Sequence, residues 1–273
     1  MIPALLLHTG TAVNWRAWTF DPSVIGGSLV AVGLYFYLQQ RWQQPISWRR
    51  AAAFLAGIAA IIAALVSPLD SAADRLLSMH MLQHVCLTTI GPPLLLLGLP
   101  PALLDRALPQ GLPRQLLRLT VNPVLTATGF IVNMWLWHVP PIYELALNHQ
   151  LVHIVMHGSF MSTALLFWWP VIQPLPELAP MREGARLLYL FATGFPMELL
   201  ALLLIASNSV VYSFYASGPY LWGISPLSDQ QVGGLIMGGL GEAASLVAIG
   251  LLFFRFLDRE SSDPVAPRPA DAA

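Results

Sequence analysis

The sequence predicts an all-α, polytopic membrane protein with seven transmembrane helices, its N-terminus outside and its C-terminus in the cytoplasm. Apolar residues make up 56% of the 273 residues, charged residues make up only 10%, and the mean hydropathy is +0.64. A soluble domain carries roughly 25% charged residues. Seven apolar stretches approach the roughly 20 residues that a spanning helix requires. We therefore expect lipid to be the solvent for most of the chain.

The seven predicted helices follow these apolar stretches along the chain. They cover residues 22–40, 50–66, 79–97, 123–138, 151–172, 185–206 and 231–257. Pro92-Pro93 should break or kink the third helix, because proline lacks an N–H group and clashes with the preceding turn. The fourth helix is short, since Pro140-Pro141 prevents its extension.

The arginines predict the orientation. Eleven of the thirteen basic residues lie between helices 1 and 2, 3 and 4, or 5 and 6, or at the end of helix 7, and only Arg16 and Arg75 lie on the other side. The positive-inside rule then places the C-terminus in the cytoplasm. We divide the chain into a periplasmic segment (1–21), a transmembrane domain (22–257) and a disordered cytoplasmic tail (258–273) that is rich in Pro, Ala and charge. The predicted location is a bacterial inner (plasma) membrane, crossed several times.

Several classes of protein do not fit this composition. The formal net charge of −1 gives no reason to expect nucleic acid as a partner. The single cysteine, Cys86, excludes an internal disulfide and any CxxC metal or redox motif, and we assign it to the core. The sequence shows no nucleophile motif and no glycine-rich phosphate loop, so we expect a protein that is not an enzyme.

All seven histidines fall at or near the predicted outer face. His80 and His84 begin the third helix, His138 ends the fourth, and His153 and His157 begin the fifth. Each i, i+4 pair places two imidazoles on one helix face, about one turn apart. Imidazole is the commonest metal ligand of proteins and suits copper, zinc and iron. We expect these five residues to be metal ligands.

The remaining histidines and the methionines carry less weight. His8 and His149 are better explained as amphipathic anchors at the interface. Met81 and Met156 lie beside the histidine pairs and are candidate accessory ligands, since a thioether favours copper(I) over zinc. Gap filling in an apolar helix explains Met81 equally well. Copper is therefore a hypothesis that depends on the imidazoles.

Three acidic residues complete the candidate site. Glu198 and Glu242 lie near the middle of helices 6 and 7, where an ionised carboxylate costs several kcal/mol, so each is protonated, paired or beside a wet path. Asp229, a further candidate accessory residue, is placed in the outer loop before helix 7. The aromatic residues of that loop fit an interfacial belt. They are Tyr212, Tyr215, Tyr220 and Trp222.

Several short motifs occur in order along the chain, from about Asp21 to Phe256. They are His80-Met81-Leu82-Gln83-His84, Gly91-Pro92-Pro93-Leu94-Leu95-Leu96-Leu97-Gly98-Leu99-Pro100, Trp137-His138-Val139-Pro140-Pro141-Ile142-Tyr143, His153 and His157 with Phe160, Phe167-Trp168-Trp169-Pro170, Phe20-Asp21-Pro22, and Asp229-Gln230-Gln231 with Gly233-Gly234. With these motifs, which are fairly specific together, the sequence resembles the CtaG-type family of seven-helix bacterial cytochrome c oxidase assembly factors. The family pattern often has an acidic residue directly before the position of His157, where this chain has Met156.

The resemblance implies a part in building a haem-copper oxidase, with copper bound or delivered at the periplasmic face. The implied partners are oxidase subunits or other copper chaperones, within the lipid bilayer. Two other classes stay open. One is a b-type haem protein for electron transfer, and the other is a transporter or proton path through Glu198 and Glu242. An assembly scaffold without metal is a further alternative.

Overall fold

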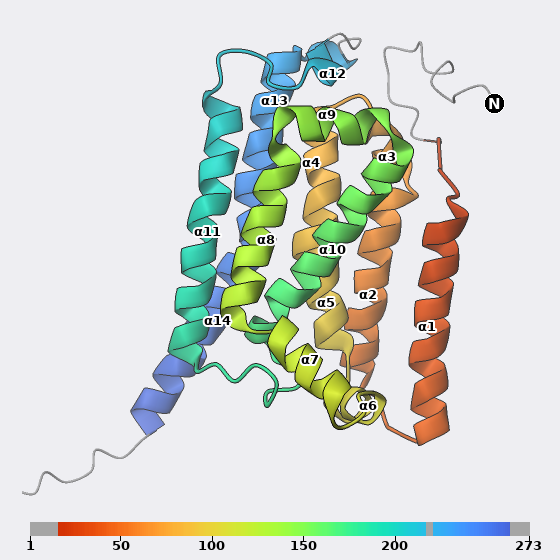
Figure 1. The fold of residues 1–273 in the computed structure, drawn as a ribbon, viewed down its shortest axis with the longest axis vertical. Helices are drawn as coiled ribbons and strands as arrows, with labels where there is room; N and C mark the ends of the chain where they lie inside the picture. The colour runs from red at the N-terminus through yellow and green to blue at the C-terminus, as the bar shows by residue number, and fades with distance from the viewer. Residues whose placement is uncertain (1–15, 217–220, 263–273) are drawn as a thin grey trace, which may run out of the picture.

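The protein is a bundle of long helices that run side by side, with shorter helices across both ends (Figure 1). The computed structural model describes residues 16–216 and 221–262, and this part of the chain contains no strand. The long elements are α1 (Pro22–Trp42), α2 (Trp48–Leu65), α4 (Leu77–Val85) with η2 (Cys86–Ile90) and α5 (Gly91–Gly98), α8 (Pro123–His138), α10 (Gln150–Ile172), α11 (Glu183–Ala206), and α13 (Pro226–Leu235) with η4 (Ile236–Leu240) and α14 (Gly241–Ser262). The short ones are α3 (Pro68–Ala73), α6 (Pro101–Ala107), α7 (Leu112–Thr120), α9 (Pro140–Asn148), α12 (Ser213–Ala216) and η3 (Leu221–Gly223).

The predicted all-α membrane fold is confirmed. Six helical segments are long and apolar enough to cross a membrane, and a seventh span is reached when α7 and α8 are taken together across a bend of 58°. Large apolar side chains stay exposed on the outside of the bundle, among them Phe191, Phe195 and Leu151. A soluble monomer rarely exposes such a surface, whereas lipid favours it.

Capping residues explain where several helices begin. Asp21 accepts hydrogen bonds from the backbone of Ser23 at the start of α1, and Asn122 caps α8 in the same way. A proline occupies the first turn of both helices, where its missing N–H is not needed. Ser225 and Pro226 repeat this pattern and begin α13 earlier than predicted. The placement of Asp229 in a loop is therefore wrong, since it lies in the first turn of α13.

The prolines of the third span produce a π-helical turn. Pro92 has no N–H to donate to the carbonyl of Thr88, and the chain widens over η2, where the N–H of Gly91 bonds to the carbonyl of Cys86. The indole N–H of Trp168 donates to the Thr88 carbonyl at 3.0 Å. A side chain of α10 thus replaces the missing backbone hydrogen bond inside the bilayer.

Glycines allow α2 and α5 to pack closely. A methyl group built on Gly98 would lie 2.5 Å from the backbone nitrogen of Phe54, and one on Gly57 would lie 2.9 Å from Leu95. Small residues at such contacts let helix backbones approach one another, which is how helices associate in lipid. The ring of Tyr35 stacks on Phe54 at 4.1 Å and joins α1 to this pair.

The two ends of the bundle differ in charge. The connections that carry most arginines lie at the end where α6 and α7 are found, and α3, α9 and α12 lie at the other end (Figure 1). The separation of arginines from histidines is thus present in the structure, while the assignment of sides stays a prediction. The helix α14 continues through Ser262, past the predicted end at 257, and 263–273 lie outside the described residues.

Replacing Gly98 by alanine should push α5 away from α2 and lower the free energy of unfolding by about 1–3 kcal/mol, as overpacking does. Thermal unfolding in detergent measures the loss. Gly129→Ala in α8 is the matched control, because a methyl group there meets no atom within 4 Å. Equal melting temperatures for the two variants would contradict the close contact.

Candidate metal centre

Three helices bring five histidines together at one end of the bundle. His80 and His84 lie on α4, His138 is the last residue of α8, and His153 and His157 lie on the first turns of α10. The ring centroids of His80 and His153 are 5.2 Å apart, those of His84 and His157 are 5.4 Å apart, and those of His84 and His138 are 6.2 Å apart. The predicted pairs therefore face one another.

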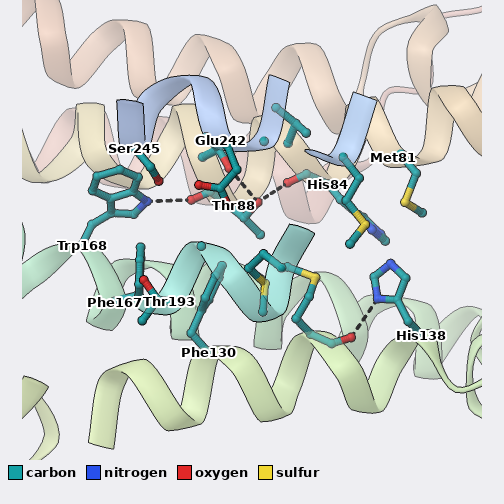
Figure 2. Close-up of a pocket in the computed structure, with 17 residues that line it drawn as sticks. Met81, His84, Thr88, Phe130, His138, Phe167, Trp168, Thr193, Glu242 and Ser245 are labelled. Atoms are coloured by element: carbon teal, nitrogen blue, oxygen red, sulfur yellow. Dashed lines mark hydrogen bonds between the residues drawn. The ribbon is translucent and has the colours of Figure 1, made fainter. Parts of the chain in front are cut away.

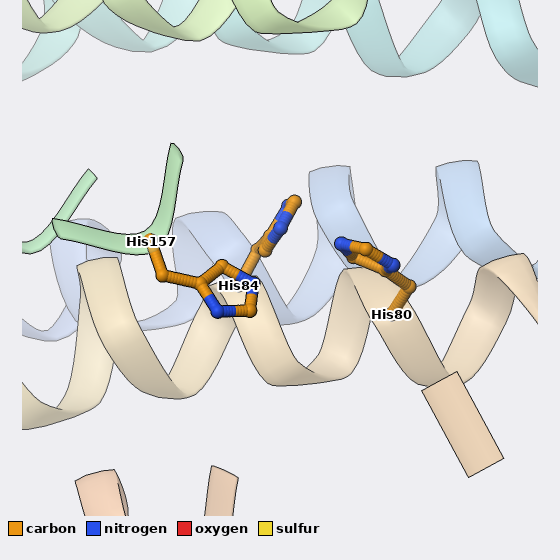
Figure 3. Close-up of side chains that lie close together, drawn as sticks. All are labelled: His80, His84 and His157. Atoms are coloured by element: carbon orange, nitrogen blue, oxygen red, sulfur yellow. The ribbon is translucent and has the colours of Figure 1, made fainter. Parts of the chain in front are cut away.

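His80, His84 and His157 form the tightest group (Figure 3). One ring nitrogen from each lies within 4.8 Å of the corresponding nitrogen of the other two. Three nitrogens around one ion at about 2.0 Å would be about 3.5 Å apart, so small rotations of the side chains suffice to close the site. His153 extends this group toward the first residue of α10, and its Nε2 lies 3.2 Å from Nε2 of His157.

Tyr215 fixes the tautomer of His80. The Tyr215 hydroxyl donates its only proton to the carbonyl of Ala73 at 3.0 Å, so it accepts a hydrogen bond from Nδ1–H of His80 at 3.0 Å. The Nε2 lone pair of His80 then points to the cluster. Orienting a metal-binding imidazole through its other nitrogen is the usual arrangement in metal sites. Tyr215 and Tyr212 are both buried, so their assignment to an interfacial aromatic belt is wrong. Tyr220 lies outside the described residues.

A hydrogen bond orients the ring of His138 in the same way, whereas the ring of His84 has no such bond within the described residues. Nδ1 of His138 donates to the carbonyl of Met134 at 2.7 Å, which leaves Nε2 with its lone pair. Over residues 16–216 and 221–262, no hydrogen-bond partner reaches Nε2 of His80, Nε2 of His138 or either ring nitrogen of His84, although all are buried. Burying an unpaired polar group costs about 1–3 kcal/mol, so four such atoms at one place are an unusual feature that fits the binding of a ligand by imidazole nitrogen.

Asp229 positions the helix that carries His80 and His84. The first turn of α4 has no side-chain cap of its own. The Asp229 carboxylate on α13 accepts from the backbone of Leu77 at 2.6 Å and of Ser78 at 3.3 Å, and also from the Ser78 hydroxyl. It thus acts as an N-cap supplied by another helix. The structure gives Asp229 this positioning role.

A second set of contacts joins α4 to α2 and α3. The amide of Gln83 donates to the carbonyl of Ala64 and to the carboxylate of Asp70, each at 2.9 Å. Asp70 also accepts from the Thr19 hydroxyl at 3.0 Å. Burial raises the pKa of the Asp70 carboxyl above its ordinary value, and the hydrogen bonds from Thr19 and Gln83 oppose this rise. Together with Asp229, this network fixes α4 along its axis.

A small cavity of about 50 Å³ continues from the histidines into the bundle (Figure 2). His84, His138 and Met81 lie at one end, and Trp168, Phe167 and Ser245 lie at the other. The two π-helical turns contribute to its walls. The lining also includes Thr88, Thr89, Met134, Thr193, Met197, Met237 and Glu242. The cavity is thus polar enough to hold water and rich in thioethers.

The other predicted residues take different places. Glu242 lines the cavity and lies against Gly194 of α11, while Glu198 lies against Gly238 of η4. Met156 is fully buried in the main core, and Cys86 packs in a separate core cluster. His149 is exposed between α9 and α10, outside the cluster, and His8 lies outside the described residues.

Comparison with known proteins gives the family. A family model for the cytochrome c oxidase caa3 assembly factor matches residues 33–259. The chain belongs to this family. The resemblance of the sequence motifs is thereby confirmed, and the histidine cluster lies on the elements that the match covers.

Relatives of this chain occur in mycobacteria. Uncharacterised proteins of Mycobacterium bovis and Mycobacterium tuberculosis are each 28% identical over 256 residues, which covers 85% of this chain, and one of Mycobacterium leprae is 26% identical over 257 residues. The chain spans 38% of the length of these curated relatives. No solved structure matches the chain.

Replacing Asp229 by alanine should leave the first backbone N–H groups of α4 unpaired in a buried place. We expect the free energy of unfolding to fall by about 1–3 kcal/mol. Thermal unfolding in detergent measures this loss, with Asp105→Ala as the control, because the Asp105 carboxylate is exposed and a surface ion pair contributes little to stability. An unchanged melting temperature would show that α4 does not depend on the cap.

Proposed function

We propose that this assembly factor binds copper(I) at the histidine cluster and passes it on during the assembly of a haem-copper oxidase. The observation that carries the proposal is the set of buried, unpartnered ring nitrogens on His80, His84 and His138. A closed hydrophobic core would not gather such atoms, because each lost hydrogen bond with water has to be compensated. A bound ion supplies that compensation.

The donor set favours a soft ion. The cluster offers neutral imidazoles without a carboxylate or thiolate within the group of His80, His84 and His157. Imidazole suits copper, zinc and iron alike, but the thioethers of Met81 and Met134 line the adjoining cavity and favour copper(I). Copper is cargo in this proposal, so the ion is released to the next protein and no chemistry on an organic substrate takes place. The protein is then not an enzyme.

The position of the cluster supports exchange with partners. It lies at the end of the bundle away from most arginines, which the positive-inside rule assigns to the periplasm of a bacterial plasma membrane. His153 is only partly buried and lies beside His157, so it offers the first ligand to an arriving ion. An oxidase subunit or another copper chaperone docked on this face would take or give copper(I) by ligand exchange.

A b-type haem fits this structure less well. The cavity beside the histidines measures about 50 Å³, whereas sites for drug-sized ligands need about 300–1,000 Å³. The aromatic rings of Phe130, Phe167 and Trp168 line this cavity, so they would have to move to admit a porphyrin. Purified protein should therefore show no Soret band.

A proton path is the second candidate function, because Glu242 lines the cavity that begins at His84. Glu198→Gln with Glu242→Gln should then abolish oxidase assembly in cells while copper binding to the purified protein stays intact. Normal oxidase activity in cells that carry only this double variant would exclude the path.

Removing the tightest group of imidazoles should remove copper(I). The full-length chain in detergent, titrated anaerobically against a chromophoric copper(I) chelator, should bind about one equivalent, and His80→Ala/His84→Ala/His157→Ala should lose it. His149→Ala is the control, because this exposed histidine lies outside the cluster. In a strain deleted for the gene, only the triple variant should fail to restore oxidase activity. Copper retained by a folded triple variant would refute the site.

Tyr215→Phe tests the orientation of His80 separately. The variant loses the acceptor for Nδ1–H of His80 but keeps the aromatic ring. Loss of such an outer hydrogen bond costs about 10–100-fold in metal affinity, so we expect a weakening in this range. Tyr37→Phe on the exposed side of α1 serves as the control, and equal affinities would show that the hydrogen bond does not orient the ligand.

A further inference from the structure

We infer that the cavity behind the histidine cluster is a second, sulfur-containing site for copper(I), formed by His84, His138 and the methionines that line it. The inference rests on the proposed function, because the ion would enter this site from His80, His84 and His157. The second site is a position deeper inside the bundle, to which the ion moves, and its ligands include sulfur as well as nitrogen. His80, His157 and His153 form the outer set of ligands, and His84 belongs to both.

The spacing of His84 and His138 fits one shared ion. Two imidazoles that bind one metal at about 2.0 Å from opposite sides place their ring centroids at most about 6.3 Å apart, with the ion between them. The centroids of His84 and His138 are 6.2 Å apart, and the rings are inclined by 77°. Both side chains are more than nine-tenths buried, and Nε2 of His138 and both nitrogens of His84 have no hydrogen-bond partner in the described part of the chain. Both residues line the cavity (Figure 2).

Thioethers line the same cavity as this pair of imidazoles. Four of the nine methionines of the chain line the same small cavity, and they come from four different helical segments. They are Met81 of α4, Met134 of α8, Met197 of α11 and Met237 of η4. Thioether sulfur binds copper(I) and has little affinity for zinc or magnesium, so a cavity with two imidazoles and four thioethers selects copper(I).

The size of the cavity suits a single ion. About 50 Å³ holds a copper ion with at most a few waters, and the phenyl and indole rings of Phe130, Phe167 and Trp168 close the far part. Thr88 lies on the π-helical turn η2 and Met237 on η4, so both irregular turns supply lining atoms. Such turns occur frequently at functional sites because they rearrange the backbone within a helix.

His84 makes the transfer a ligand exchange. The ion leaves the nitrogens of His80 and His157 and gains Nε2 of His138 and thioether sulfur, while His84 is a ligand at both positions. Copper remains copper(I) throughout, all ligands are neutral, and neither an electron nor a proton has to move. The ion thereby passes from a nitrogen site near the end of the bundle to a nitrogen and sulfur site inside it.

X-ray absorption at the copper edge tests the inference on the full-length chain in detergent, loaded anaerobically with copper(I). We expect nitrogen scatterers and a sulfur shell at about 2.3 Å. The variant Met81→Leu/Met134→Leu/Met197→Leu/Met237→Leu should lose the sulfur shell and keep the nitrogen shell, because no lining thioether remains. Leucine conserves the volume of methionine, so the fold should be retained. Met156→Leu is the matched control, because this buried methionine does not line the cavity, and it should keep the sulfur shell.

A second variant separates the two positions. His80→Ala/His157→Ala should still bind copper(I) with the sulfur shell, because His84, His138 and the thioethers remain. Labelling with selenomethionine should replace sulfur by selenium in the copper spectrum, which distinguishes a thioether from the thiol of Cys86. Copper bound by nitrogen alone in the parent, or a sulfur shell that survives the quadruple methionine variant, would overturn the inner site and leave the proposed function standing. No copper in the parent would overturn the proposed function itself.

Discussion

Inside a bilayer every backbone N–H and C=O has to find its partner within the protein, and this requirement governs the whole structure. It restricts the described chain to helices and makes each departure from regular geometry depend on a specific side chain. The clearest case is the third span, where Pro92 removes one donor and the indole of Trp168 provides another for the carbonyl of Thr88. The π-helical turn that results also supplies part of the cavity wall.

The same requirement explains how the histidines are held. The helix α4 has no cap of its own, and the carboxylate of Asp229 on α13 provides one from another part of the bundle. Tyr215 and the carbonyl of Met134 take up the Nδ1–H groups of His80 and His138. These contacts orient the imidazoles, and they leave Nε2 of His80 and Nε2 of His138 without a hydrogen-bond partner in the described part of the chain. The proposed copper site depends on these two nitrogens and on His84.

Much of the fold follows from the sequence alone, because the constraint of lipid acts on local patterns. Runs of apolar residues locate the spans, arginines separate from histidines, and an i, i+4 pair of histidines has to share a face of its helix. The predicted helix ends are less accurate where a capping residue such as Ser225 begins a helix within a polar segment. The site was predictable only as a list of imidazoles, since helical spacing says nothing about the neighbour across the bundle. Tyr215 and Asp229 could not be assigned, because they reach His80 and Leu77 over separations of 135 and 152 residues.

The short helix α8 also affects the lipid around it. Its 16 residues extend about 24 Å, whereas the hydrocarbon of a typical bilayer is about 30 Å thick. At one end α8 meets α7 at a bend of 58°, and at the other end α9 follows it. Val132 and Leu136 of α8 are exposed. A bilayer accommodates a short hydrophobic helix by thinning locally, by snorkelling of flanking side chains or by association of the helix with another protein. Each of these responses would take place beside α8, the helix that ends at His138, and a neighbouring protein with an equally short helix would match it.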